Sequence, residues 1–161
     1  GELKLAIEHY LEKNYENYTI ARTGWNVGFN HKSRCVIQLT YETLMKKNAR
    51  MASDNYFSLS HTRDTANGLY NSSKQENLPK IHIASEKIIN RYEMAESIKS
   101  KSINGNQMSF EKCLFSEIIY TEPRGRVNDL NCKLSRDLLQ LKYLDSEELI
   151  LKKVKYLDNN F

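Results

Sequence analysis

The stretch from His31 to Tyr70 constrains this chain most, because four potentially reactive side chains occur there in a defined order. His31 and Arg34 form an H-x-x-R pattern, His61 follows in the segment FSLSH, and Tyr70 lies nine residues later. A lone histidine is usually structural, and a tyrosine in a chain that contains ten is usually a core or surface residue. The information therefore lies in the order and spacing of the four residues together.

These residue types suit phosphoryl transfer through a protein nucleophile. A tyrosine hydroxyl, whose free pKa is about 10, becomes a useful nucleophile when a phosphodiester is held in line and fixed donors match its growing charge. Arginine gives two parallel hydrogen bonds to phosphate oxygens and stays charged. Histidine exchanges protons near neutral pH. The pattern needs no metal and no other cofactor.

The chain resembles the carboxyl-terminal part of the tyrosine recombinase catalytic domain. The resemblance rests on the segment HKSR, the helix predicted after it, and the segment LSH followed by Tyr70. The segments DNYF and SHTRDTANGLY are most similar to telomere resolvases (protelomerases), a branch of that family. The resemblance implies that Tyr70 cleaves DNA through a 3′-phosphotyrosyl intermediate and that the strands are rejoined as hairpin telomeres. It further implies that Arg34 and His61 stabilise the transferring phosphate and that His31 assists.

The family also uses an arginine and a hairpin lysine well upstream of H-x-x-R. Only thirty residues precede His31, and Arg22, the one arginine among them, does not match that motif. We therefore expect a carboxyl-terminal fragment of a DNA-breaking and rejoining enzyme that is inactive by itself. Two alternatives stay open: a conventional tyrosine site-specific recombinase or integrase, and a non-catalytic helical DNA-binding module.

Charge, cysteine usage and hydropathy limit the partners and the cellular location that we expect for this protein. A net charge of +4 is compatible with a nucleic-acid partner. Cys35, Cys113 and Cys132 are widely spaced without a C-x-x-C, which indicates reduced thiols rather than a disulfide framework or zinc site. The sequence shows no membrane-length apolar run and no signal peptide. We expect a cytoplasmic, nucleoid-associated protein of bacterial or phage origin, with no membrane partner.

Helical spacing of apolar residues predicts a mainly α fold. The resemblance implies that this fold is the carboxyl-terminal part of a tyrosine recombinase catalytic domain followed by a small helical subdomain. Residues 1–75 form the catalytic portion, and 76–161 form the helical DNA-binding subdomain. The expected helices cover 2–14, 32–51, a segment from His61 through Tyr70, 83–100, and segments that begin near Ser109, Asp129 and Ser146. An unbroken helix would point His61 and Tyr70 to opposite sides, so the hypothesis requires a break, most simply at Gly68.

Basic side chains are the predicted phosphate contacts. We expect binding to double-stranded DNA with inverted repeats, by a dimer in the full-length enzyme, with affinity that falls steeply as salt rises. The predicted DNA-binding residues are Lys32, Lys80, Lys87, Arg91, Lys99, Lys101, Arg124 and Arg126.

Overall fold

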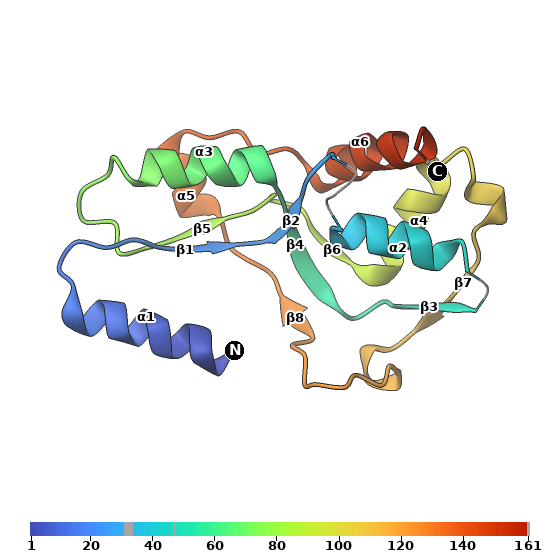
Figure 1. The fold of residues 1–161 in the computed structure, drawn as a ribbon, viewed down its shortest axis with the longest axis horizontal. Helices are drawn as coiled ribbons and strands as arrows, with labels where there is room; N and C mark the ends of the chain where they lie inside the picture. Colours follow the sequence, from blue (N-terminus) through green and yellow to red (C-terminus); the bar gives the residue numbers. More distant parts are fainter. Residues whose placement is uncertain (31–33, 47, 161) are drawn as a thin grey trace.

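The computed structural model describes residues 1–30, 34–46 and 48–160 and shows an α/β protein (Figure 1). The helices are α1 (Glu2–Asn14), α2 (Val36–Leu44), α3 (Thr62–Ser72), α4 (Arg91–Lys101), α5 (Lys133–Leu139) and α6 (Ser146–Asp158), with 3₁₀ turns η1 (Gly105–Gln107) and η2 (Phe115–Glu117). The strands are β1 (Ile20–Thr23), β2 (Trp25–Val27), β3 (Ala49–Ala52), β4 (Tyr56–His61), β5 (Lys80–Ile83), β6 (Ile88–Asn90), β7 (Phe110–Cys113) and β8 (Val127–Asn128).

Most strand pairs among the described residues are parallel and join segments far apart in the sequence. β1 pairs with β5, β2 with β4, β3 with β7, and β4 with β8, all in parallel, whereas β6 runs antiparallel to β4. The first half of β4 lies between β6 and β8, and its second half pairs with β2. Parallel strands need long crossover connections, so sequence-local patterns do not reveal them.

Strand β4 is buried on both of its faces. Phe57 and Leu59 point into the core and are fully buried. Ser58 and Ser60, on the other face, are also buried, and both are hydrogen-bonded: the Ser60 hydroxyl donates to the Ile83 carbonyl at 2.9 Å, and Ser58 Oγ accepts from the backbone N–H of Leu130 at 3.0 Å. Small hydroxyl side chains therefore satisfy their polar atoms where the strand has no solvent-facing side.

Glycine is required where β1 ends and β2 begins. A Cβ atom at Gly24 would lie 2.6 Å from the Ser58 carbonyl oxygen and 2.8 Å from Ser60 Oγ, which is too close for any other residue. The Gly24 N–H donates to the Ile83 carbonyl at 3.1 Å. This close approach lets the chain pass from the β1–β5 sheet directly into the sheet that contains β4.

Three helices and the sheet around β4 enclose the main core. Helix α2 contributes Ile37, Tyr41 and Leu44, and these pack with apolar residues of β4, α4 and α6. Helix α1 exists over the predicted residues, but it contains no buried residue.

The mainly α fold class is corrected by this structure. The predicted helix over 32–51 is the nine-residue α2 followed by strand β3, and Tyr56–His61 forms strand β4. The helix expected from Ser109 is instead β7 followed by a 3₁₀ turn. Short apolar runs fit a helix or a buried strand equally well, and pairing with distant strands decides between them. The helix expected from Ser146 is confirmed as α6.

The predicted division into 1–75 and 76–161 stays a prediction, although one core cluster contains residues from both segments, such as Leu59 and Val154. Among the helices of the described residues, none has both the length and the apolar character needed to cross a membrane.

Candidate functional site

No hydrogen bond, ion pair or ring contact joins Arg34, His61 and Tyr70, the predicted catalytic residues that the structure describes. His31 and the predicted contact Lys32 lie outside the described residues. Arg34 is exposed and precedes α2. His61 ends β4, and its ring stacks on Phe29 at a centroid distance of 4.7 Å. Tyr70 is 63% exposed on α3, with the Lys74 ammonium 3.9 Å from its ring centroid.

Helix α3 has no break that could turn Tyr70 towards His61. It runs from Thr62 to Ser72, and Gly68 lies inside it, buried against Ile83. Nine residues of helix separate the two side chains by about 13 Å along the axis. The geometric condition set by the recombinase hypothesis is therefore not met.

Most of the predicted DNA-contacting lysines are instead paired with carboxylates. Lys80 lies 3.5 Å from Glu8 and 3.2 Å from Glu12. Lys87 and Lys101 both contact Glu147, at 3.2 and 2.7 Å. The ammonium of Lys99 lies 5.9 Å from the Phe110 ring. Lys80, Lys87 and Lys101 therefore have carboxylate partners within the chain, whereas Lys99 contacts an aromatic ring.

Arginine and aromatic side chains gather instead on the side of the sheet where β6 leads into α4. We call this set the Arg91 cluster: Trp25, Phe57, Arg91, Tyr120 and Arg124. The Trp25 and Phe57 rings stack at 5.1 Å, and the Arg91 guanidinium lies over both, 4.7 Å from the Trp25 centroid and 5.5 Å from that of Phe57. Arg124 lies 5.2 Å from the Tyr120 ring.

The local sequence explains the placement of Arg91. It is the first residue of α4, directly after Asn90, whose side chain accepts the Glu93 N–H at 2.8 Å in a capping box. Asn90 pairs with Tyr56 across β6 and β4, so the start of α4 is held beside the start of β4. The amino end of a helix favours anions through its free N–H groups and its dipole.

The electrostatics of the Arg91 cluster are unbalanced towards positive charge. Burial lowers the pKa of the Arg91 guanidinium; Tyr120 opposes this effect, and the nearby Arg124 adds to it. Within the described part of the chain, neither Arg91 nor Arg124 has a carboxylate within ion-pairing distance. Arginine stays protonated at neutral pH. Two guanidinium groups without a counterion are an arrangement that an anion would stabilise.

The loop that carries Arg124 is fastened to β4. Asn55 donates through Nδ2 to the Arg126 carbonyl at 2.8 Å, and the Tyr56 N–H donates to the same carbonyl at 3.0 Å. The Arg126 guanidinium lies 3.7 Å from Asp54. The loop therefore presents its arginines from a defined position beside the sheet.

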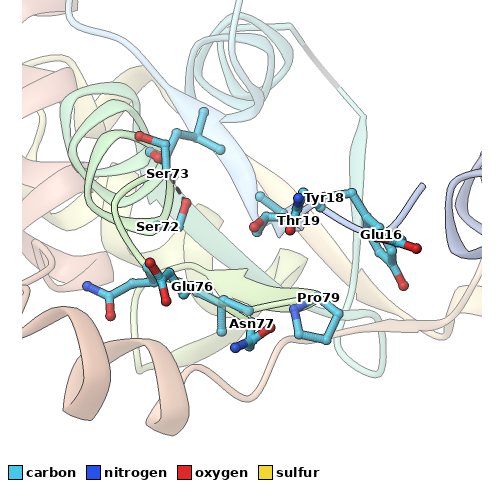
Figure 2. Close-up of a pocket in the computed structure, with 13 residues that line it drawn as sticks. Glu16, Tyr18, Thr19, Ser72, Ser73, Glu76, Asn77 and Pro79 are labelled. Atoms are coloured by element: carbon cyan, nitrogen blue, oxygen red, sulfur yellow. Dashed lines mark hydrogen bonds between the residues drawn. The ribbon is translucent and has the colours of Figure 1, made fainter.

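A groove lies elsewhere on the described part of the chain. It has a volume of about 800 Å³ and is formed by the connection from α1 to β1 and by the segment from the end of α3 to Pro79. Figure 2 shows Ser72 and Ser73 on one side and Tyr18 and Thr19 on the other. Its lining contains acidic residues but no lysine or arginine, so it does not suit a phosphate group. Within the described residues no cluster of three or more His, Cys, Asp or Glu side chains could hold a metal ion.

Sequence reasoning identified part of the Arg91 cluster and missed the rest. Arg91 and Arg124 were predicted phosphate contacts, although for DNA. Nothing in the sequence placed Trp25 and Phe57 under Arg91, or Tyr120 beside Arg124. The missing signal was the pairing of β4 with β6 and β8, which brings residues more than thirty positions apart into contact.

Solved structures similar to this chain are enzymes of sugar nucleotides. A dTDP-4-dehydrorhamnose reductase from Clostridium acetobutylicum matches with a TM-score of 0.78 at 18% identity, over 98% of this chain and 54% of its own. A UDP-glucose 4-epimerase from Thermotoga maritima, solved with UDP-glucose, matches with 0.74 at 15% identity, over 99% and 53%. A dTDP-glucose 4,6-dehydratase from Bacillus anthracis, in complex with NAD, matches with 0.70 at 12% identity, over 98% and 50%.

No protein-family model and no curated protein sequence matches the chain. The chain spans about half the length of these solved structures.

These matches correct the functional interpretation drawn from the sequence. The resemblance to tyrosine recombinases and telomere resolvases is wrong, because the chain has an α/β fold with parallel strands that is shared with sugar-nucleotide enzymes. The same matches contradict the other predictions that depended on this resemblance. These are DNA cleavage and rejoining, hairpin telomeres, the integrase and DNA-binding alternatives, and a DNA partner with inverted repeats. The expected nucleoid association also loses its support. At identities below 20% the likeness shows the fold, and the chain shares that fold with one half of each enzyme.

Proposed function

We propose that this chain binds the phosphate-bearing part of a sugar nucleotide at the Arg91 cluster, as the substrate-binding part of a reductase, epimerase or dehydratase. The single observation that carries the proposal is the pair of arginines, Arg91 and Arg124, held over aromatic rings without a carboxylate partner among the described residues. The kinds of substrate named for the similar structures, dTDP-sugars and UDP-glucose, supply the ligand class.

The geometry fits a nucleoside diphosphate in three ways. Arg91 is the first residue of α4, at the end where the helix dipole is positive, and its guanidinium lies over the Trp25 and Phe57 rings. Arg124, on a loop that hydrogen bonds fix to β4, adds a second guanidinium without a carboxylate partner among the described residues, whereas Arg126 of the same loop pairs with Asp54 at 3.7 Å. The Tyr120 ring, 5.1 Å from that of Phe115, provides an aromatic surface on which a base can stack. The G-x-G-x-x-G fingerprint of dinucleotide-binding loops does not occur in the sequence, and the proposal concerns the sugar nucleotide alone.

Trp25 provides a direct assay because it is the only tryptophan of the chain and lies under Arg91. We expect dTDP-glucose or UDP-glucose to change its fluorescence saturably and thymidine, which has no phosphate, to leave it unchanged. Arg91→Met keeps the apolar stem over the rings but removes the charge. It and Arg124→Gln should each weaken binding by about 10- to 100-fold, since hydrogen bonds to charged groups contribute roughly 1.5–3 kcal/mol.

Arg63→Gln is the matched control. Arg63 is an exposed arginine of α3 outside the cluster, so its loss lowers the net charge equally and should leave the affinity unchanged. Equal weakening by all three variants would reduce the effect to overall charge. A fluorescence signal that never responds to either sugar nucleotide would refute the proposal.

A further inference from the structure

The connection between β7 and β8 is fastened to the sheet near both of its ends (Figure 1). Near its start, Asp54 accepts a hydrogen bond from the Phe115 N–H at 2.6 Å. At its end, the Asn55 amide donates to the Arg126 carbonyl at 2.8 Å. Asp54 and Asn55 are consecutive residues between β3 and β4, so both ends of the connection are held at one corner of the sheet. Surface loops whose ends lie close together are frequently functional.

Between these fixed ends, residues 119–124 lack the polar interactions that would fix a chain segment. The preceding 3₁₀ turn is still held, because Arg50 pairs with Glu117 at 3.2 Å. Within the described part of the chain, residues 119–124 take part in no hydrogen bond and no ion pair. Ile119 is 99% exposed although its side chain is apolar. Segments with few buried contacts and an unbonded backbone open at little cost in free energy, so this stretch can move while its ends stay in place.

The charges at the Arg91 cluster oppose a close approach of this stretch to the sheet. Arg91 lies over the Trp25 and Phe57 rings at the start of α4. Burial lowers the pKa of the Arg91 guanidinium; Tyr120 opposes this effect, and the positive charge of Arg124 adds to it. Arg124 lies 5.2 Å from the Tyr120 ring, and both residues belong to the stretch that can move. Two like charges without a counterion repel each other, so the repulsion favours positions of Arg124 farther from Arg91.

We infer that residues 118–124 form a flap that closes over the phosphate groups of a bound sugar nucleotide, and that Arg124 makes closure depend on the ligand. An anion between the guanidinium groups of Arg91 and Arg124 replaces their repulsion by two attractions, so it binds more tightly when the flap is closed. A ligand shifts a conformational equilibrium only through such a difference in affinity. The inference rests on the proposed function and adds how that site admits and retains its ligand.

Hydrogen exchange of backbone amides, resolved to single residues by mass spectrometry, tests the flap in the intact protein. In the free protein we expect the amides within residues 119–124 to exchange at about the rate of an unstructured peptide. Saturating dTDP-glucose should slow their exchange by about 10-fold or more across the whole flap, including Thr121 and Glu122, which lie outside the Arg91 cluster. Thymidine, which has no phosphate, should leave the exchange unchanged. Trp25 fluorescence of the same samples reports whether the ligand is bound.

The Arg124→Gln variant separates closure from binding. At a concentration of dTDP-glucose that saturates the Trp25 response, this variant should hold the ligand but leave the amides of the flap unprotected. Glu122→Gln is the matched control, because Glu122 is exposed on the same flap and has no ion-pair partner among the described residues. Protection by dTDP-glucose should persist in this control.

The following results would overturn the inference. Amides that are already protected in the free protein would mean that the flap is rigid, and protection confined to Arg124 would mean direct contact without closure. Protection that persists in ligand-bound Arg124→Gln would show that closure does not depend on this residue. A Trp25 response without slower exchange would refute the flap alone, whereas the absence of both would refute the proposed function and the flap with it.

Discussion

Glu147 joins three elements of the fold, and its removal should destabilise the protein measurably. The carboxylate at the start of α6 accepts hydrogen bonds from Lys101 and Ser97 of α4, both at 2.7 Å, and from Lys87, just before β6, at 3.2 Å. Burial alone raises the pKa of this carboxyl, but the three donors outweigh it and hold the pKa at about 2, below its ordinary 4.5.

The magnitude follows from this difference. A shift of about 2.5 pKa units corresponds to an upper value of about 3 kcal/mol. The Glu147 side chain is 37% exposed, so solvent screening reduces the expected contribution to about 1–2 kcal/mol. Because the folded pKa is depressed, the contribution is fully present above pH 4.5 and is lost as the pH falls towards 2. More than half should be gone by about pH 3.

Urea unfolding of Glu147→Gln at pH 7 and pH 3 measures this directly. We expect the variant to be less stable than the wild type by about 1–2 kcal/mol at pH 7 and the difference to shrink at pH 3. Glu148→Gln is the control: Glu148 is the next residue and pairs with Lys152 at 2.7 Å on the exposed side of α6, so its loss should cost less than about 0.5 kcal/mol. If both variants behave alike at pH 7, or if the Glu147 difference does not change with pH, the reasoning is wrong.

Two further predictions concern packing and thiol chemistry. Gly68→Ala should destabilise the protein by about 1–3 kcal/mol in urea unfolding, although alanine favours helices, because the added Cβ would meet the buried Ile83 side chain at 2.8 Å. Asn67→Ala, at the exposed neighbouring position, should be neutral or stabilising, and the reverse order would contradict the packing argument. Burial raises the pKa of the Cys113 and Cys132 thiols, so both should react with a disulfide reagent at pH 8 much more slowly in the native protein than in urea. Equal rates in the two states would mean that these thiols are not buried.

The recombinase interpretation shows how a one-dimensional pattern can mislead. His61 and Tyr70 have the family spacing, and sequence reasoning recognised that convergence on one phosphate requires a break near Gly68. The structure instead uses that glycine to pack α3 closely on Ile83, so the residue that the hypothesis needed as a hinge is a contact point. A motif fixes spacing along the chain, whereas chemistry depends on distance in space.

The basic residues predicted to contact DNA could not be sorted by their partners from the sequence. Lys80, Lys87 and Lys101 have glutamate partners that lie more than forty residues away. Arg91 and Arg124 have no such partner among the described residues, and that difference is what makes them a candidate site. Only the folded chain shows which positive charges are already neutralised.

By itself the sequence determined the elements whose signals are local. The helices that became α1 and α6 follow from apolar residues at helical spacing, and the start of α6 follows from acidic residues and caps in its first turn. The tertiary structure alone decided that Tyr56 to His61 is a buried strand, that the start of α4 lies beside it, and that Arg91 there has no carboxylate partner among the described residues. The physical reason is that parallel pairing, burial and charge neutralisation all depend on residues distant in the sequence. The local periodicity of the sequence does not indicate which residues those are.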